Sequence, residues 1–325
     1  MENCEIVGPL VECVPNFSEG RAAHVIAAIA RAAASVPGVL ILDMQTDPDH
    51  NRSVLTFAGP PGSVLEAAVA SAGVAARLID LTRHSGVHPR VGAADVIPFV
   101  PWREVTLEEC AALAWTAGEQ LWHRHAVPVY FYAAASRRPD RTRLEQIRKG
   151  GFAYLKTAAL SDDYLRPDVG GAALHPTAGA SIIGARPLLV AYNVNLRTPD
   201  VAVARRIAAL IRQSSGGLAG VKALGVYLES RGLAQVTTTI TDFELTPVHV
   251  VFNAICAAAA REGVAVQGSQ LIGLIPRKAL EMAGATDFRW ETWDDSMILE
   301  TRLAMAAAAQ LRIPDLSSDA GLSSE

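Results

Sequence analysis

The chain has 325 residues, of which 50% are apolar and 19% charged, and its formal net charge at pH 7 is −4. This length exceeds that of a usual single hydrophobic core, so we expect two domains. The charge balance lacks the basic excess of nucleic-acid binders, and no apolar run reaches the ~20 residues of a membrane span, which argues against a nucleic-acid or membrane partner.

The first half of the chain alternates between strand-like and helix-like hydrophobic periods. In chain order these periods predict a strand at 10–16, a helix at 24–34, strands at 39–45 and 53–58, a helix at 62–79 and a strand at 96–100. A helix at 107–123, a strand at 127–132 and a charged helix at 141–148 follow. The core of this pattern is βαββαβ.

The second half repeats this order. We expect a strand at 188–195, a helix at 200–213, strands at 221–228 and 234–239, a helix at 248–262 and a strand at 264–271. Two such units predict an α+β fold with two ferredoxin-like βαββαβ subdomains. We place the subdomains at 1–180 and 181–312, and expect the polar, Ser/Asp-rich tail 313–325 to be disordered.

The loop from His84 to Asp95 concentrates residue types that carry chemistry. Pro89 favours an extended backbone at His88, so the imidazole is presented from a fixed position. Gly86 and Gly92 permit close approach of a ligand to the backbone. The loop is therefore a candidate catalytic site, although a surface turn with a solvated histidine is the common alternative.

A glycine-rich segment at 168–180 lies between the two repeats. Its composition rules out a helix or a central strand. It fits a plain interdomain linker about as well as a binding loop, but a cleft between domains is a common place for a small-molecule site.

Four ordered motifs carry a family resemblance. His88-Pro89-Arg90-Val91-Gly92-Ala93-Ala94-Asp95 resembles the HPR(M/V)GA(L/A)D signature of glutamate formimidoyltransferases, which also form the front half of formiminotransferase-cyclodeaminase. The segments 11–21, 49–54 and 268–276 resemble the family's VECVPNFSEG(R), (D/T)(H)NR(S/T)V and GSQL(V/I)GL(V/I)P elements. The similarity runs from about Leu10 to about Leu280.

The resemblance implies two subdomains with a folate cleft between them and a one-carbon transferase of histidine catabolism. Such an enzyme transfers the formimino group of N-formimino-L-glutamate to N5 of tetrahydrofolate, which is the co-substrate. His88 occupies the position of the family's catalytic histidine and is expected to act as general base and then general acid. Asp95 and Asp49 are the candidates for the acid that orients it.

The resemblance and residue chemistry also suggest which residues bind the substrates. Arginines suit the carboxylates of both substrates, and amides suit the edge of a pterin ring. The candidates for substrate binding are Asn16, Asn51, Arg52, Arg90, Arg186 and Gln270. The candidates for folate binding are Gly170, Gly171, Ala172, Ala173, Leu174, His175, Pro176, Thr177, Ala178 and Gly179.

Several further expectations concern what the protein lacks or needs. Cys4, Cys13, Cys110 and Cys256 have no CxxC spacing, and no histidine pattern has a supporting acid, so we expect reduced thiols and no metal. The first residues do not resemble a secretory signal, which predicts a cytoplasmic protein. We expect a homodimer from the family, and a separate cyclodeaminase because nothing after Arg312 resembles that domain.

Two local features complete the pattern. Gln45 stands where we expect an aspartate in the bifunctional animal enzymes. Acidic residues around Trp290 and Trp293, Glu291 among them, are interpreted as part of an amphipathic surface packed by the last helix.

Two other functions fit the same residues. A folate-dependent formyltransferase, or a transferase that uses formiminoglycine, would need the same cleft and the same histidine, because donor specificity rests on one or two contacts. Outside enzymes, paired ferredoxin-like domains also serve as metabolite-binding or nucleic-acid-binding modules. The strands lack the exposed aromatic run of an RNA-binding module, which weighs against the last of these.

Overall fold

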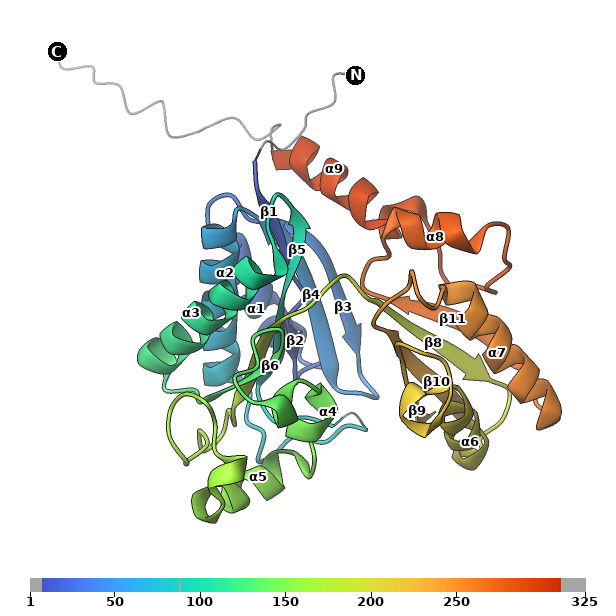
Figure 1. The fold of residues 1–325 in the computed structure, drawn as a ribbon, viewed down its shortest axis with the longest axis horizontal. Coiled ribbons are helices and arrows are strands. Elements are labelled where there is room, and N and C mark those ends of the chain that lie inside the picture. The colour runs from blue at the N-terminus through green and yellow to red at the C-terminus, as the bar shows by residue number, and fades with distance from the viewer. Residues whose placement is uncertain (1–7, 88, 311–325) are drawn as a thin grey trace.

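The computed structural model describes residues 8–87 and 89–310. Within these ranges the chain forms two β-sheets with helices packed on them (Figure 1). The first sheet has seven strands and the second has four. The protein is therefore a mixed α+β structure with two sheets, as the sequence predicts.

The elements of the first sheet follow one another as β1 (Leu10–Cys13), β2 (Asn16–Phe17), α1 (Ala23–Ala34), β3 (Leu40–Asp47), β4 (Arg52–Gly59), α2 (Pro61–Leu78) and β5 (Ala94–Arg103). The chain continues through α3 (Leu107–His125), β6 (Val129–Ala133), α4 (Leu144–Ile147), α5 (Gly151–Ser161) and β7 (Ser181–Ala185). β1 and β2 both lie between β4 and β5, and β3 forms the edge beyond β4. On the other side, β7 pairs in parallel with β5 and with β6.

The second sheet is built from β8 (Val190–Leu196), α6 (Val201–Ile211), β9 (Val221–Leu228), β10 (Leu233–Ile240), α7 (Val248–Arg261) and β11 (Val266–Ile272). Its strand order is β11-β8-β10-β9, and every neighbouring pair is antiparallel. Two helices, α8 (Arg277–Ala283) and α9 (Leu299–Gln310), follow.

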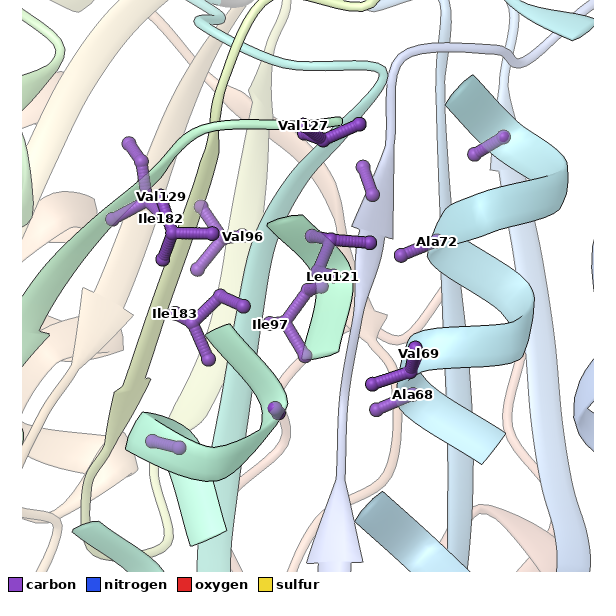
Figure 2. Close-up of a cluster of buried hydrophobic side chains, with 14 of the residues drawn as sticks. Ala68, Val69, Ala72, Val96, Ile97, Leu121, Val127, Val129, Ile182 and Ile183 are labelled. Atoms are coloured by element: carbon purple, nitrogen blue, oxygen red, sulfur yellow. The ribbon is translucent and has the colours of Figure 1, made fainter. Parts of the chain in front are cut away.

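Each sheet has its own hydrophobic core on its helical face. In the first, Ile97 of β5 and Ile183 of β7 are buried with Val69 of α2 and Leu121 of α3 (Figure 2). In the second, Tyr192 and Val194 of β8 pack with residues of α6 and α7. In the second sheet the face opposite these helices carries the polar side chains of Asn193, Asn195 and Gln235.

Among residues 8–87 and 89–310, side-chain contacts and a small apolar cluster join the two halves. Gln45 contacts Gly273, Asp49 contacts Ser230, and Lys222 forms an ion pair of 2.9 Å with Glu145. The apolar cluster contains Leu40 and Leu42 of β3 with Leu274 and Leu299, so α9 lies against β3 (Figure 1). These contacts place the β3 and β4 side of the first sheet next to the second sheet.

The structure differs from the expected elements mainly between 141 and 186. The charged helix expected at 141–148 is only the single turn α4, and α5 and β7 have no counterpart in the prediction. Gly150, with a φ of 84°, lies between α4 and α5, and Gly151, with a φ of 67°, begins α5; the two glycines obscure the helical period. Because β7 pairs with β5 and β6, the division between the sheets falls between Ala185 and Val190, after the boundary expected at residue 180.

The tail 313–325 lies outside the described residues, so its expected disorder stays a prediction. None of the helices in 8–87 and 89–310 is long and apolar enough to cross a membrane.

Candidate functional site

The loop that carries the predicted catalytic histidine connects α2 to β5. His88 itself lies outside the described residues, but the residues before and after it are described. In the part of the loop before His88, the Val87 N–H donates to the Asp49 carbonyl at 3.3 Å, and Nε2 of the His84 ring lies 3.0 Å from the Asn51 carbonyl oxygen. The loop is thus bound to the turn between β3 and β4.

Asn51 is the centre of that attachment. Its side-chain oxygen accepts from the Gly20 N–H at 2.9 Å, and its amide donates to the Ser85 carbonyl at 2.9 Å. Its φ is 46°, a left-handed conformation that asparagine adopts more readily than most residues. Asn51 therefore joins the 16–21 segment to the loop, and its candidate role in substrate binding stays a prediction.

His84 has a defined environment beside Asn51. Because a carbonyl only accepts, Nε2 is the protonated nitrogen of this ring, and Nδ1 is buried without a hydrogen-bond partner among the described residues. Burial and the nearby Arg90 guanidinium lower the pKa of His84. The neutral form is thus favoured.

Asp95 fixes the part of the loop that follows His88. Its Oδ1 accepts from the backbone N–H groups of Val91 at 2.6 Å and Gly92 at 3.1 Å. Its Oδ2 accepts from Nη2 of Arg148 at 2.5 Å, and both side chains are largely buried, at 4% and 11% exposure. Asp95 shapes the backbone that follows His88, and its role as the orienting acid stays a prediction.

Asp49, the other candidate for the orienting acid, reaches across to the second sheet. Its carboxylate accepts from the Ser230 N–H at 3.0 Å and from the Ser230 hydroxyl at 2.5 Å. Ser230 lies in the turn between β9 and β10. Asp49 therefore joins the two halves of the molecule next to the loop.

Arg52 and Asn16 lie together at the end of the first sheet. Nη2 of Arg52 donates to Oδ1 of Asn16, whose amide donates to the Val14 carbonyl at 2.7 Å. Burial, with a smaller effect of the Arg148 guanidinium, lowers the pKa of Arg52 to about 9. The structure thus brings two predicted residues together with Arg148, which the sequence analysis did not identify.

The other two predicted arginines lie in different surroundings. Arg90 is half-buried, both of its terminal nitrogens lie 3.4 Å from the Gly86 carbonyl, and burial lowers its pKa. Arg186 follows β7, where it donates to the Pro187 carbonyl at 2.9 Å. Near Arg186, burial raises the pKa of Glu12 to about 7, against the opposing effect of the guanidinium.

The predicted folate segment packs directly against the loop. The backbone N–H of Ala93 donates to the Ala178 carbonyl at 2.8 Å, and the backbone N–H of Leu81 donates to the Thr177 carbonyl at 2.9 Å. Gly179 pairs with Gly92 and has a φ of 72°, and a Cβ built there would lie 2.0 Å from the Val91 carbonyl. Only glycine permits this approach, so the segment is part of the loop's scaffold as well as a connection between repeats.

The beginning of that segment lies elsewhere. Gly170 packs against Trp122 and Pro128, whereas His175 lines a hollow of about 460 Å³ with His123, His125 and Arg124. Nδ1 of His175 accepts from the Ala178 N–H at 2.9 Å. The ten predicted residues therefore do not share one environment, and their binding role stays a prediction.

A polar network covers the open face of the second sheet near Asp49. Glu291 accepts from Asn195 at 2.8 Å and from Gln270 at 2.9 Å, and it forms an ion pair with Arg231 at 2.8 Å. These bonds lower the pKa of Glu291 against the opposing effect of burial. Gln235 donates to Asn195 at 2.8 Å, and its buried Oε1 has no hydrogen-bond partner among the described residues.

Of this network, only Gln270 is among the residues predicted to bind substrate. The interpretation of Glu291 as part of a surface packed by the last helix is wrong. The rings of Trp290 and Trp293 stack with their centroids 5.2 Å apart and pack against the second hydrophobic core. The last helix, α9, packs instead on β3. Arg231 and Glu291 are 60 positions apart, so no local pattern could have paired them.

Gln45, the departure from the expected aspartate, has a structural contact of its own. Its Oε1 accepts from the Gly273 N–H at 2.9 Å, and its Nε2 donates to the Gly273 carbonyl at 3.3 Å. An amide supplies both the donor and the acceptor that this backbone pairing requires, and a carboxylate supplies only acceptors. Gln45 therefore links the two halves of the molecule.

In the part of the chain that the structure describes, no three His, Cys, Asp or Glu side chains lie together so that they could hold a metal ion.

Comparison with protein families matches two consecutive models over nearly the whole chain. Residues 10–186 match the formiminotransferase domain, N-terminal subdomain, and residues 191–318 match the formiminotransferase domain. The first of these ranges ends just after β7, in agreement with the strand pairing.

Curated relatives share this pattern. The chain is 42% identical over 299 residues to a glutamate formimidoyltransferase of Thermoplasma acidophilum, covering 92% of this chain and 98% of the relative. It is 42% identical to a glutamate formimidoyltransferase of Streptococcus pyogenes, over 90% of this chain and 98% of the relative. It is 44% identical to the formimidoyltransferase-cyclodeaminase of Sus scrofa, where it covers 85% of this chain and 52% of the relative.

Proposed function

Because the chain belongs to the formiminotransferase family, we propose that it is a glutamate formimidoyltransferase, which transfers the formimino group of N-formimino-L-glutamate to N5 of tetrahydrofolate. The products are 5-formiminotetrahydrofolate and L-glutamate. Tetrahydrofolate is the co-substrate, and the reaction belongs to histidine degradation and one-carbon metabolism.

One structural observation supports this proposal most directly. The part of the loop that follows His88 and the glycine-rich segment 170–179 are bound to each other through backbone contacts, Ala93 to Ala178 and Gly92 to Gly179. The family resemblance assigns catalysis to one of these segments and folate binding to the other. Their contact fits a reaction in which folate N5 must meet the proton-transfer group.

The proposed chemistry needs two proton transfers. N5 attacks the formimino carbon, a tetrahedral intermediate forms, and the bond from that carbon to the nitrogen of glutamate breaks. N5 loses a proton on attack, and the departing amine gains one. A histidine can serve both steps because its pKa lies near neutrality, so His88 is the general base and then the general acid.

The finer architecture is part of the same proposal. The strand order β11-β8-β10-β9 and the βαββαβ path are those of a ferredoxin-like unit, and we assign that topology to both halves. We place the folate cleft between the two sheets, on the sides away from α2, α3, α6 and α7 and beside the contact of Asp49 with Ser230. The homodimer, and a separate cyclodeaminase that releases ammonia, also belong to this proposal.

A turnover assay tests the function. The protein is incubated with tetrahydrofolate and, in turn, with formiminoglutamate, formylglutamate and formiminoglycine, and the folate product is measured. Preference for formiminoglutamate supports the proposal. Preference for formylglutamate or formiminoglycine would support the corresponding alternative, and folate binding without any transfer would support a binding module.

A further inference from the structure

The segment between β6 and β7 packs directly against the part of the loop that follows His88. Nη2 of Arg148, the residue that follows α4, donates to Oδ2 of Asp95 at 2.5 Å. The backbone N–H of Phe152 in α5 donates to the Arg90 carbonyl at 2.9 Å. The loop is therefore attached at two places to a segment that follows α3 and β6 in the sequence.

Asp95 connects Arg148 to the backbone of the loop. Its Oδ1 accepts from the N–H groups of Val91 at 2.6 Å and Gly92 at 3.1 Å, while its Oδ2 accepts from Arg148. Both side chains of the ion pair are largely buried. Burying a carboxylate is costly unless a cation and hydrogen-bond donors surround it. Arg148 therefore determines whether Asp95 can stay in place and hold the two amides.

Other groups hold the carbonyls of the same backbone. The Ser18 hydroxyl donates to the Gly92 carbonyl at 2.7 Å, and the Ala180 N–H donates to the Val91 carbonyl at 3.2 Å. Neither contact fixes the amides of Val91 and Gly92, for which Asp95 is the acceptor. A displaced Asp95 should therefore free these amides without unfolding the strand that follows.

α4 presents Arg148 from a fixed backbone although this helix is a single turn. One helical turn gains too few hydrogen bonds to be stable alone. Ile147, at the end of the turn, is buried in the first hydrophobic core. Glu145 forms an ion pair of 2.9 Å with Lys222 of β9, so the same turn is also attached to the second sheet. The position of Arg148 is thus determined by both halves of the molecule.

We propose that Arg148 is a positioning residue, which holds Asp95 and through it the loop backbone that places His88 for proton transfer. This inference rests on the proposed function, and it concerns a residue that neither the sequence motifs nor the family resemblance assigned. In this role Arg148 touches neither substrate, because its contact is with a buried carboxylate whose two oxygens are both occupied. A displacement of a reacting group by about 1 Å can cost about 100-fold in rate, so such a contact is sufficient to affect catalysis.

Steady-state kinetics with formiminoglutamate and tetrahydrofolate test this role. We expect Arg148→Met to lower kcat by roughly 10- to 100-fold, while KM for each substrate stays within about threefold of the wild-type value. Arg148→Lys keeps a positive charge beside Asp95 and should lose less of kcat than Arg148→Met. A raised KM for formiminoglutamate with kcat retained would contradict the proposal, because it would indicate a residue that binds the donor.

Arg141 provides the matched control. Its Nη1 lies 2.7 Å from Oδ1 of Asp168, and this ion pair is also buried. Asp168 accepts from the Phe131 N–H in β6 at 2.8 Å, so the pair holds a strand instead of the loop. Arg141→Met and Arg148→Met should both lower the melting temperature by several degrees. Arg141→Met should keep kcat within about threefold of wild type. An equal loss of kcat in both variants would show that destabilisation alone explains the effect, and would overturn the proposal.

A double variant addresses the risk that Arg148→Met does not fold. Arg148→Met leaves the Asp95 carboxylate buried without its cation. Asp95→Asn/Arg148→Met removes both charges and retains an amide oxygen for the N–H groups of Val91 and Gly92. The double variant should therefore melt at a higher temperature and have a higher kcat than Arg148→Met. A kcat no higher than that of Arg148→Met would contradict the proposal.

Hydrogen–deuterium exchange separates this inference from the proposed function, because it needs no substrate. In peptides that contain Val91 and Gly92, Arg148→Met should exchange about tenfold faster than wild type, and Arg141→Met should exchange as wild type does. This result supports the positioning role even if formimino transfer is not observed with any donor. Unchanged exchange of these peptides in Arg148→Met contradicts the inference, whatever the activity of the protein.

Discussion

The backbone N–H of Ala93 donates to the carbonyl of Ala178 at 2.8 Å, although the strands β5 and β6 and the helices α3, α4 and α5 lie between the two residues in the sequence. Ala93 follows the predicted catalytic histidine, and Ala178 is the last but one residue of the predicted folate segment. Because these bonds are between backbone groups, a change in one segment is transmitted to the other without any side chain between them.

Gly179 should be intolerant of substitution. Gly179→Ala combines a φ of 72° with a Cβ that would lie 2.0 Å from the Val91 carbonyl, so the loop must move. We expect a lower melting temperature and at least tenfold weaker folinate binding, measured by thermal shift and fluorescence titration.

The matched control for this glycine is Gly220→Ala. Its φ is 69°, but its added Cβ would meet only ordinary contacts at 3.5 Å. It should lose stability through backbone strain and keep folinate affinity. Equal affinities of the Gly179 and Gly220 variants would contradict the view that the Gly179 contact shapes the site.

Asn51 should stabilise the folded protein through both its backbone conformation and its side-chain hydrogen bonds. Asn51→Gly keeps the left-handed φ of 46° but loses the bonds to Gly20 and Ser85, whereas Asn51→Ala loses the bonds and adds strain. Urea unfolding should show a lower free energy of unfolding for both variants than for wild type, and the value for the alanine variant should be lower than that for the glycine variant by about 1 kcal/mol. An alanine variant as stable as the glycine variant would show that the strain is not borne by this residue.

Asp49 and Ser230 should act as a pair. If Asp49 mainly joins the two halves, then Asp49→Ala and Ser230→Ala should each lower kcat/KM, and the double variant should be less impaired than the product of the two single effects. The pH profile should keep its shape in all three variants. Independent effects, with a shifted pH profile only in Asp49→Ala, would instead identify Asp49 as the acid that orients His88.

The raised pKa of the buried Glu12 carboxyl should make the stability of the protein depend on pH. Burial raises its pKa from 4.5 to about 7, so between these values the folded protein retains a proton that the unfolded chain has lost. The free energy of unfolding should therefore fall as pH rises from 4.5 towards 7 and then level off. Glu12→Gln, which has no proton to lose, should match wild type near pH 4.5 and melt several degrees higher above pH 7.

Calorimetric melting curves across this range measure the effect. Glu119→Gln, an exposed change on α3, is the control and should leave the wild-type pH dependence intact. A melting-temperature difference between Glu12→Gln and wild type that does not vary with pH would contradict this assignment.

The parts of the fold that follow local periodicity could be predicted from the sequence. α7 buries residues at helical spacing, such as Val248, Val251 and Ile255, and the expected strand at 221–228 matches β9. β7 was missed because five residues beside a glycine-rich segment give too short a pattern, and its place is determined by pairing with β5 and β6. Local patterns do not identify such parallel partners.

In the candidate site too, residues that stand close together in the sequence could be predicted, whereas those paired over a long range could not. The loop from His84 to Asp95 stood out because its residue types are concentrated in a short segment. Arg148 did not, because it lies 53 positions from Asp95 in what was interpreted as a charged helix. A long-range ion pair leaves no local signal, and Glu291 with Arg231 was missed for the same reason.

The role of His88 is the central claim, and the turnover rate of His88→Ala with formiminoglutamate and tetrahydrofolate tests it most directly. We expect the rate to fall by roughly 10²- to 10⁴-fold, as loss of a positioned proton-transfer group does, with folinate affinity little changed. The wild-type rate should rise with pH where an imidazole titrates. A folded His88→Ala protein that keeps more than about a tenth of the wild-type rate would contradict the account.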